Sequence, residues 1–352
     1  MSTVEEIDKA INLAKKYGKP PVVMHCNSSY PTPHDEINLN VIRFLVERYP
    51  NCIIGYSGHE KGLEPTVLAI ALGTKFKKRP GSVLDRPALE VFECVSCGLV
   101  FLSSFDHIKE GFYKNSEMHG KDALDIQAWV RETEWDDERH FQYLKSALPN
   151  MRILDFGCGP GGFILKARDS AAIIHGVELE TRLSRHYENC GLTVFKNLSD
   201  IPSDIRERGY DIITMFHVLE HIPDPKSILS ELSEIVADGG QIIVEVPNAD
   251  DALLTLYKNK PFSNFTYWSC HLFLFTLKTL KMLFSQINLK VNYIKQIQRY
   301  PLANHLYWLA DGKPGGHQKW HFLNSPELHA AYEKQLAAIG KCDTILASVS
   351  RY

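Results

Sequence analysis

The sequence lacks the features that mark membrane, secreted and nucleic-acid-binding proteins. No apolar run approaches the roughly 18 residues that a membrane-spanning helix needs. The first residues read MSTVEEIDKAINLAKK, without the basic start and continuous apolar core of a secretory signal. A net charge of -3 leaves no basic excess for binding a phosphate backbone. We therefore expect a soluble, cytoplasmic protein with no nucleic-acid partner and no membrane partner.

Cysteine is too sparse for a disulfide framework. Eight cysteines are spread over 352 residues, and a chain of this length can fill a hydrophobic core without disulfide bonds. Only Cys94 and Cys97 have the spacing of a metal-binding pair, whereas structural zinc usually needs four ligands from two such pairs. Because the second pair is missing, we predict a metal-free or reducible thiol pair and no bound metal.

Changes in pattern divide the chain into four units. Residues 1–79 alternate helical and strand-like segments, as in the βα units of a parallel sheet. A basic stretch followed by proline and glycine ends this unit near residue 80. Residues 80–122 form an arm with the cysteine pair, residues 123–290 the main domain, and residues 291–352 an aromatic and histidine-rich extension.

The main domain shows the alternation of strands and helices that is typical of a doubly wound sheet. Strands are expected at 152–156, 173–178, 192–195, 211–216 and 241–246, and helices at 123–147, 161–168, 181–190, 226–236 and 276–287. This order predicts an α/β fold, a Rossmann-like three-layer sandwich.

A glycine-rich turn follows the first of these strands. The segment ILDFGCGPGG supplies Gly157, Gly159 and Gly161, and glycine lets the chain turn sharply and approach a ligand closely. The glycine spacing alone also fits a dinucleotide or a purely structural turn. Asp155, however, puts a carboxylate where a pyrophosphate would sit and so favours a ligand with positive charges. Glu178 ends the next strand 23 residues later, where an acid accepts ribose hydroxyls. Together these residues favour S-adenosylmethionine as the cofactor.

Two further segments extend this pattern into a family resemblance. With the glycine turn, the segments YDIITMFHVLEHIPDP at 210–225 and GGQIIVEVPN at 239–248 resemble class I S-adenosylmethionine-dependent methyltransferases that modify ubiquinone and sugars. The resemblance implies that Asn197 and Leu198 lie near the adenine and that Phe216 and His217 border the methionine end. The cysteine pair looks like half of the zinc-binding arm found before many such domains in sugar-biosynthesis clusters.

Candidate bases follow the fourth strand and recur near residue 270. Methyl transfer is an in-line displacement that depends mainly on positioning, but a hydroxyl acceptor usually also needs a base. Among His217, Glu220, His221 and His271, we favour His221 and His271 as the catalytic pair. A structural histidine bonded to the backbone remains the alternative for each. Aromatic residues with Arg299 and Lys313 in the last unit would suit a sugar or phosphate-bearing acceptor, or else form a buried cap on the sheet.

The first unit resembles a different family. The segments MHCNSSYPTP at 24–33 and GYSGHE at 55–60 resemble N-acetylneuraminate synthases, which are (β/α)8 barrels that condense phosphoenolpyruvate with an amino sugar. The resemblance implies that His25 and His59 correspond to metal-binding histidines of that family. Because only about three of eight barrel strands are present, we predict a partial barrel fragment without synthase activity.

These observations predict a methyltransferase that O-methylates a sugar or sugar nucleotide in surface-glycan biosynthesis of the nonulosonic acid type. The partial barrel leaves unpaired strand edges and apolar surface, so a homo-oligomer formed through residues 1–79 is part of this prediction. Two alternatives stay open. They are synthase activity from the first unit, and a non-catalytic scaffold protein that binds S-adenosylmethionine.

Overall fold

The computed structural model describes residues 2–17, 21–27, 29, 32–33, 36–57, 76–109, 111–114 and 124–352. His59, and the helix expected from about residue 63, lie outside the described residues. No helix within the described ranges is both long and apolar enough to cross a membrane.

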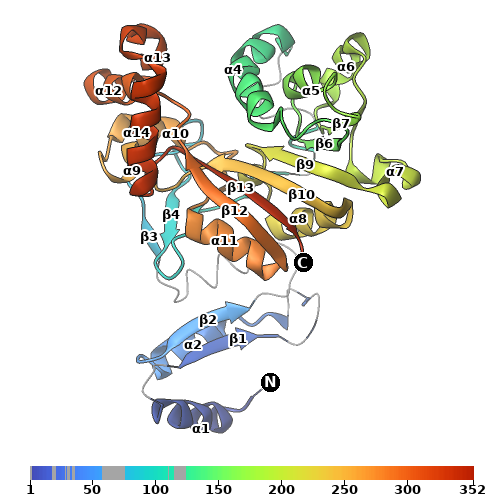
Figure 1. Ribbon diagram of the computed structural model, residues 1–352. Helices are drawn as coiled ribbons and strands as arrows, with labels where there is room; N and C mark the ends of the chain where they lie inside the picture. Colours follow the sequence, from blue (N-terminus) through green and yellow to red (C-terminus); the bar gives the residue numbers. More distant parts are fainter. Residues whose placement is uncertain are drawn as a thin grey trace.

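The N-terminal segment forms a small βα arrangement of its own (Figure 1). It contains α1 (Val4–Lys15), β1 (Val22–Cys26), α2 (Asn40–Arg48) and β2 (Ile53–Ser57). The strands β1 and β2 pair in parallel, as βα units require. Its own hydrophobic cluster consists of Ile11, Ile42, Leu45, Tyr49 and Ile54. The closure of these elements into a partial barrel stays a prediction.

A four-stranded antiparallel sheet contains the cysteine pair. Its order is β11 (Phe273–Leu274), β5 (Val100–Leu102), β4 (Val91–Cys94) and β3 (Phe76–Lys78). Cys94 and Cys97 lie at the tight turn between β4 and β5, where the Gly98 amide donates to the Cys94 carbonyl at 2.8 Å. Because β3 belongs to this sheet, residues 76–78 pair with the arm and not with the N-terminal segment.

The main sheet has seven strands. Its order is β12 (Leu289–Ile297), β13 (Thr344–Arg351), β10 (Val236–Pro247), β9 (Tyr210–Phe216), β6 (Arg152–Phe156), β7 (Ile173–Val177) and β8 (Val194–Phe195). All strands expected between residues 152 and 246 are present. In the whole sheet, β13 pairs antiparallel with β12 and with β10, and the other neighbouring strands pair in parallel. The sheet thus continues past residue 290, which falls inside β12, into the unit expected to be an extension.

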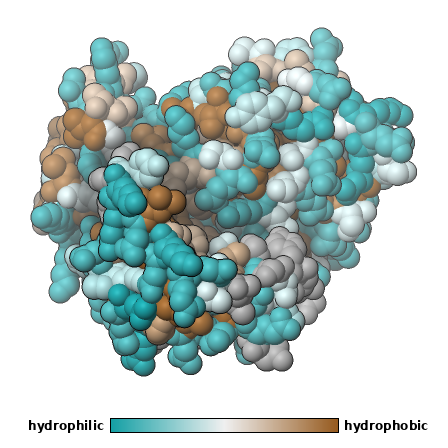
Figure 2. Space-filling view, turned by 90° about the horizontal axis from the view of Figure 1, so that it is seen from below, coloured by the Kyte–Doolittle hydropathy of each residue, from teal (hydrophilic) through white to brown (hydrophobic). Residues whose placement is uncertain are grey.

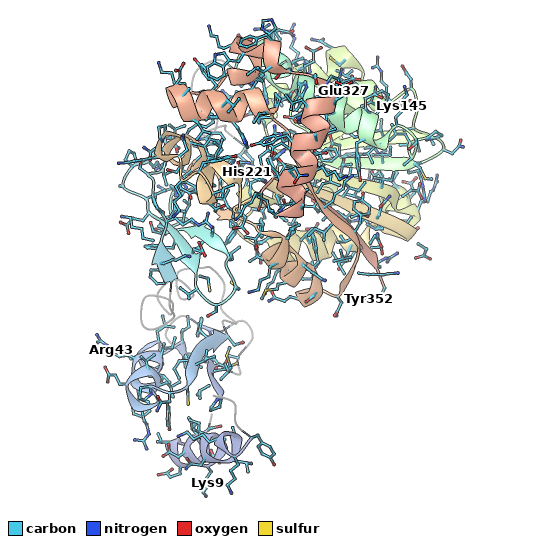
Figure 3. All side chains as sticks on the ribbon, turned by 60° about the vertical axis from the view of Figure 1, so that its left-hand side comes forward. Lys9, Arg43, Lys145, His221, Glu327 and Tyr352 are labelled. Carbon is cyan, nitrogen blue, oxygen red and sulfur yellow. The ribbon has the colours of Figure 1, made fainter. Side chains whose placement is uncertain are left out.

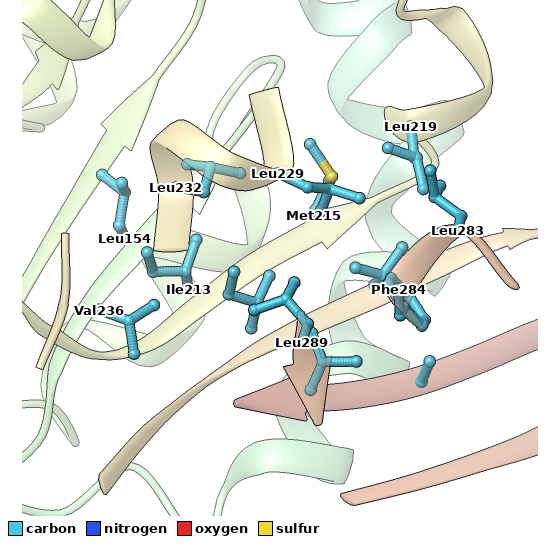
Figure 4. Packing of buried hydrophobic residues seen from close by; sticks show 14 of the residues in the cluster. Leu154, Ile213, Met215, Leu219, Leu229, Leu232, Val236, Leu283, Phe284 and Leu289 are labelled. Atoms are coloured by element: carbon cyan, nitrogen blue, oxygen red, sulfur yellow. The ribbon is translucent and has the colours of Figure 1, made fainter. Parts of the chain in front are cut away.

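Alternating residues of the strands pack into two hydrophobic cores, one on each face of the sheet. Leu154 and Ile213 face α8 (Pro225–Glu234) and α11 (Leu277–Gln286), as the close view in Figure 4 shows. Their chain neighbours Ile153 and Ile212 instead pack with residues of α4 (Ile126–Leu144) and α5 (Gly162–Ala167). This period of two confirms the three-layer α/β sandwich, visible in Figure 1.

Several shorter helices complete the fold. They are η3 (Thr181–Leu183), α6 (Ser184–Cys190), η4 (Leu198–Asp200), α7 (Ser203–Arg208), η5 (Leu219–His221), α9 (Ala252–Thr255), α10 (Lys260–Thr266), α12 (Leu302–Asp311), α13 (Gly316–Lys319), η6 (His321–Leu323) and α14 (Pro326–Ala338). Along the chain, α12, α13, η6 and α14 come between the edge strand β12 and its neighbour β13. One face of the molecule is mostly hydrophilic, with hydrophobic residues in small groups (Figure 2).

Candidate active site

The glycine turn after β6 has the conformation that its sequence predicts. Gly157 has φ +75°, and a Cβ there would lie 2.4 Å from Cγ2 of Val218. Gly159 has φ +50°, and the Trp129 ring of α4 lies 3.3 Å from the position of its Cβ. Gly161 caps α5 with φ +80°. The turn therefore has neither the backbone angles nor the space for ordinary side chains at these positions.

Glu178 is tied to the glycine turn directly. Its Oε2 accepts a hydrogen bond from the Gly159 amide at 3.0 Å, and its Oε1 accepts one from the Glu180 amide at 2.9 Å. Burial raises the pKa of this carboxyl above its ordinary value. The acid at the end of β7 and the turn after β6 therefore form one rigid unit.

Asp155 lies beneath the same turn. Its side chain is only 4% exposed and accepts a hydrogen bond from Oγ1 of Thr214 on the neighbouring strand β9 at 2.7 Å. Burial raises the pKa of Asp155 to about 7. A positively charged ligand beside it would favour the ionised carboxylate.

These residues border a cavity of about 560 Å³ at the carboxyl ends of the parallel strands, the edge where open α/β sheets bind ligands. Of the residues predicted for the site, Asp155, Gly157, Gly159, Glu178, Phe216, His217 and His221 line it. Helix α4 covers the cavity and contributes Trp129, Thr133, Asp136, Asp137 and His140. Six of the nine predicted cofactor residues thus share one pocket, and α4 supplies one of its walls.

Four predicted site residues are not among those lining the cavity. Leu198 is 5% exposed and packs in the hydrophobic core under α8. Asn197 is exposed, and its side chain bonds to Asp200 in a capping box that begins η4. Gly161 belongs to the glycine turn and caps α5, and the His271 ring packs against the ring of His221. The structure therefore gives Asn197 and Leu198 structural contacts and no direct place on the cavity wall.

A buried charge network forms the floor of the cavity beside α4. Glu245 of β10 is fully buried and bonds to Arg139 at 3.0 Å, to His140 at 3.2 Å and to His217 at 2.9 Å. Charge and hydrogen-bond interactions with these three residues outweigh burial and hold the pKa of Glu245 well below its ordinary value. Although burial favours the neutral ring, the Glu220 carboxylate 3.5 Å away and the hydrogen bond to Glu245 raise the pKa of His217 to about 9. The signal in the sequence was a lone acid inside the apolar run of β10.

Arg299 joins this network through a second acid. Its Nε donates to Oδ1 of Asp136 at 3.1 Å, and Asp136 also pairs with Arg139 at 2.9 Å. Burial alone would raise the pKa of Asp136, but the neighbouring guanidinium of Arg299 lowers it to about 2. Arg299 lines the cavity, but its charge is already matched by Asp136.

The other end of the cavity brings His221 and His271 together. The Leu272 amide donates to the Glu220 carbonyl at 2.8 Å, which joins η5 to the segment before β11. The two imidazole rings have centroids 4.9 Å apart. Burial lowers the pKa of both rings, that of His271 to about 4. Figure 3 places His221 inside the body formed by the two sheets. Both predicted catalytic histidines therefore belong to one cluster, and His221 faces the cavity.

Comparisons with known proteins match the two parts of the chain to two families. A family model described as a methyltransferase domain matches residues 127–294, and a NeuB family model matches residues 1–78. N-acetylneuraminate-9-phosphate synthase of Drosophila melanogaster is 38% identical over 80 residues, which cover 22% of each chain. Ubiquinone biosynthesis O-methyltransferase of Shewanella sp. (strain ANA-3) is 26% identical over 149 residues, 36% of this chain and 63% of that protein.

The solved structures that are similar to this chain include a SAM-dependent methyltransferase from Archaeoglobus fulgidus. It has 18% sequence identity and a TM-score of 0.42, and the match covers 64% of this chain and 99% of that one. The chain spans only 22% of the fly synthase and 63% of the bacterial O-methyltransferase.

The chain thus matches a methyltransferase-domain model over residues 127–294 and a NeuB-family model over residues 1–78. Both resemblances seen in the sequence are confirmed.

Proposed function

We propose that this protein transfers a methyl group from S-adenosylmethionine to an oxygen atom of a small-molecule acceptor. The observation that carries the proposal is the junction of Asp155, the Gly157 to Gly159 turn and Glu178 in one buried cavity within a methyltransferase domain. In this proposal Asp155 binds the positive charges of the methionine end, and Glu178 accepts hydrogen bonds from the ribose hydroxyls.

In this proposal, residues at one end of the cavity bind the cofactor, and residues at the other end face the acceptor. S-adenosylmethionine supplies an electrophilic methyl group, which an oxygen lone pair takes while the carbon–sulfur bond electrons stay on sulfur. Asp155, Glu178 and the turn would hold the cofactor, and α4 with Trp129 would form one wall beside it. His221, with His271 next to it, lies at the end of the cavity proposed for the acceptor, where the acceptor hydroxyl has to lose its proton. Positioning supplies most of the rate in such a displacement.

The acceptor class is proposed from the two matches taken together. The curated relatives of residues 127–294 include O-methyltransferases, which supports oxygen as the acceptor atom. Those of residues 1–78 include N-acetylneuraminate-9-phosphate synthases, which supports a nonulosonic acid or a related sugar or sugar nucleotide. This second step is an argument from association in one chain. We also propose that the enzyme is located in the cytoplasm.

Self-association through the N-terminal segment is proposed from its surface. Several large apolar side chains there are at least 43% exposed, namely Leu13, Tyr17, Val22, Met24, Phe44 and Ile53. Surface of this kind favours contact with another protein chain.

Methyl transfer from labelled S-adenosylmethionine to a panel of free and nucleotide-activated nonulosonic acids tests the function. We expect label in one acceptor class, together with release of S-adenosylhomocysteine. Cofactor binding without transfer to any acceptor would favour the scaffold alternative. Condensation of phosphoenolpyruvate with an amino sugar would favour the synthase alternative.

A further inference from the structure

Four polar atoms in one small region have no hydrogen-bond partner among the described residues. They are both carboxylate oxygens of Glu220, Nδ1 of His221 and Nδ1 of His271, and all four are buried. Glu220 is 0% exposed, and its nearest cationic atom, Nδ1 of His217, lies 3.5 Å from Oε1. Buried polar groups in native proteins are normally paired. This concentration of unpaired acceptors indicates a binding site.

The surroundings of the two imidazoles favour the tautomer that a metal ligand needs. The backbone of Cys270 lies beside the His221 ring, and that of Thr266 beside the His271 ring. Since Nδ1 is the unpaired atom of each ring, a proton on Nε2 would serve these backbone groups. The Nδ1 lone pair is then free. Metal-binding histidines are held in this way, with the other ring nitrogen donating to a carbonyl or carboxylate.

The three side chains are also close enough to share one ion. One ligand atom from each of Glu220, His221 and His271 lies within 4.8 Å of the others. Two ligands with bonds of about 2.1 Å lie up to about 4.2 Å apart across one ion, so small side-chain rotations suffice. The hydrogen bond from the Leu272 amide to the Glu220 carbonyl holds the two contributing segments together.

A second cluster meets the same distance criterion but is occupied by cations of the chain itself. In Asp136, His140 and Glu245, Arg139 bonds to Glu245 at 3.0 Å and Arg299 to Asp136 at 3.1 Å. A metal ion there would have to displace two guanidinium groups. No guanidinium or ammonium bonds to the Glu220 carboxylate in the described part of the chain, so the first cluster is the candidate.

We propose that Glu220, His221 and His271 bind a divalent first-row transition metal ion, of the zinc or manganese type, at the acceptor end of the cavity. Two imidazole nitrogens and one carboxylate suit such ions, and three protein ligands leave coordination positions open. His221 lines the cavity, so an open position would face it. The sequence analysis predicted no metal because it considered the cysteine pair and the two histidines of the first unit, and took His221 and His271 only as bases.

The site also defines the acceptor more closely, and this step rests on the proposed methyl transfer. An ion with two open positions favours an acceptor with two neighbouring oxygens, such as a vicinal diol or an α-hydroxy acid. A hydroxyl bound to the ion loses its proton more readily, and that proton passes to water. A nitrogen that holds the ion cannot also accept a proton, so the metal takes the place of the imidazole base.

Metal binding by the full chain tests the proposal without any methyl acceptor. We would replace Cys94 and Cys97 by serine to remove the thiol pair, strip metals with a chelator, and titrate Zn²⁺ and Co²⁺. We expect one ion per chain, and visible Co²⁺ absorption bands of a site with nitrogen and oxygen ligands. In the same background, Glu220→Gln and His271→Asn should weaken binding at least about 100-fold, more than the loss of an outer-shell contact. His321→Asn, at an exposed histidine, is the matched control.

Two results would overturn the inference. One is the absence of Co²⁺ bands and of stoichiometric Zn²⁺ in the serine background. The other is unchanged affinity in both ligand variants, with circular dichroism showing that they are folded. Calorimetry with S-adenosylmethionine separates this inference from the proposed function. Metal binding without cofactor binding would refute the function and keep the site, and the reverse would refute the site alone.

Discussion

Oε2 of Glu178 accepts a hydrogen bond from the Gly159 amide at 3.0 Å. This contact joins the acid at the end of β7 to the glycine turn after β6, so the two features proposed to bind the cofactor are held together. The geometry of the turn and the position of the carboxylate are consequently set before any ligand binds.

Glu178→Ala should weaken S-adenosylmethionine binding by roughly 1 to 3 kcal/mol, because ribose hydroxyls and the Gly159 amide lose their acceptor. Calorimetric titration measures this. Glu188→Ala, at an exposed acid on α6, should leave the affinity unchanged. Equal affinity for both variants would remove Glu178 from the site.

The affinity of the wild-type chain for S-adenosylmethionine should fall about tenfold between pH 8 and pH 6. Burial raises the pKa of Asp155 to about 7, so at pH 6 the positively charged ligand binds only after the carboxyl loses its proton. Asp155→Asn should bind more weakly with a flatter pH profile. Parallel profiles for the two proteins would contradict this role.

Asp155 should also affect stability in the opposite sense from an ordinary salt-bridged carboxylate. Because its folded pKa exceeds its unfolded value, its contribution to folding is complete below about pH 4 and is lost as the pH rises toward 7. Urea denaturation at pH 5 and pH 7.5 should show this difference in the wild type and a smaller one in Asp155→Asn.

Gly157→Ala should destabilise the chain by more than Gly191→Ala. Both glycines have positive φ, +75° and +64°, but a Cβ at Gly191 meets nothing within 4 Å, whereas at Gly157 it meets Val218 at 2.4 Å. Gly191→Ala should therefore cost only about 1 kcal/mol for the backbone angle, and Gly157→Ala should add a steric cost and lower cofactor affinity. Thermal melts compare the stability of the two variants, and calorimetry compares their cofactor affinity. Equal effects would show that the Val218 side chain moves aside without a cost.

Glu245→Gln should lower the free energy of unfolding by about 3 to 5 kcal/mol, since it leaves Arg139, His140 and His217 without their shared buried carboxylate. Glu234→Gln, at an exposed acid on α8, should change it by less than about 0.5 kcal/mol. Chemical denaturation measures both. A small effect for Glu245 would mean that the network relaxes around the loss.

The sequence predicted the parallel strands well because each is a short apolar run that ends in a turn or a polar residue. The strand at 152–156 was located to the residue. The edge pair β12 and β13 was missed, since the helices between residues 297 and 344 separate two strands that meet only in the folded chain.

The site was predicted unevenly for a related reason. Asp155, Gly157 and Glu178 carry local signals, because each stands at the end of a strand or in a tight turn. The contact between Arg139 and Glu245 joins residues 106 positions apart, which no local pattern encodes. Asn197 and Leu198 were predicted as adenine-binding residues from family resemblance alone. In the structure Asn197 caps η4, and Leu198 packs in the hydrophobic core.

Calorimetric titration of the wild-type chain with S-adenosylhomocysteine, beside the Gly157→Ala and Glu178→Ala variants, tests the central claim most directly. We predict one binding site per wild-type chain and weaker binding in both variants. Absence of saturable heat in the folded wild-type protein, or equal affinity in all three, would contradict a cofactor site at this cavity.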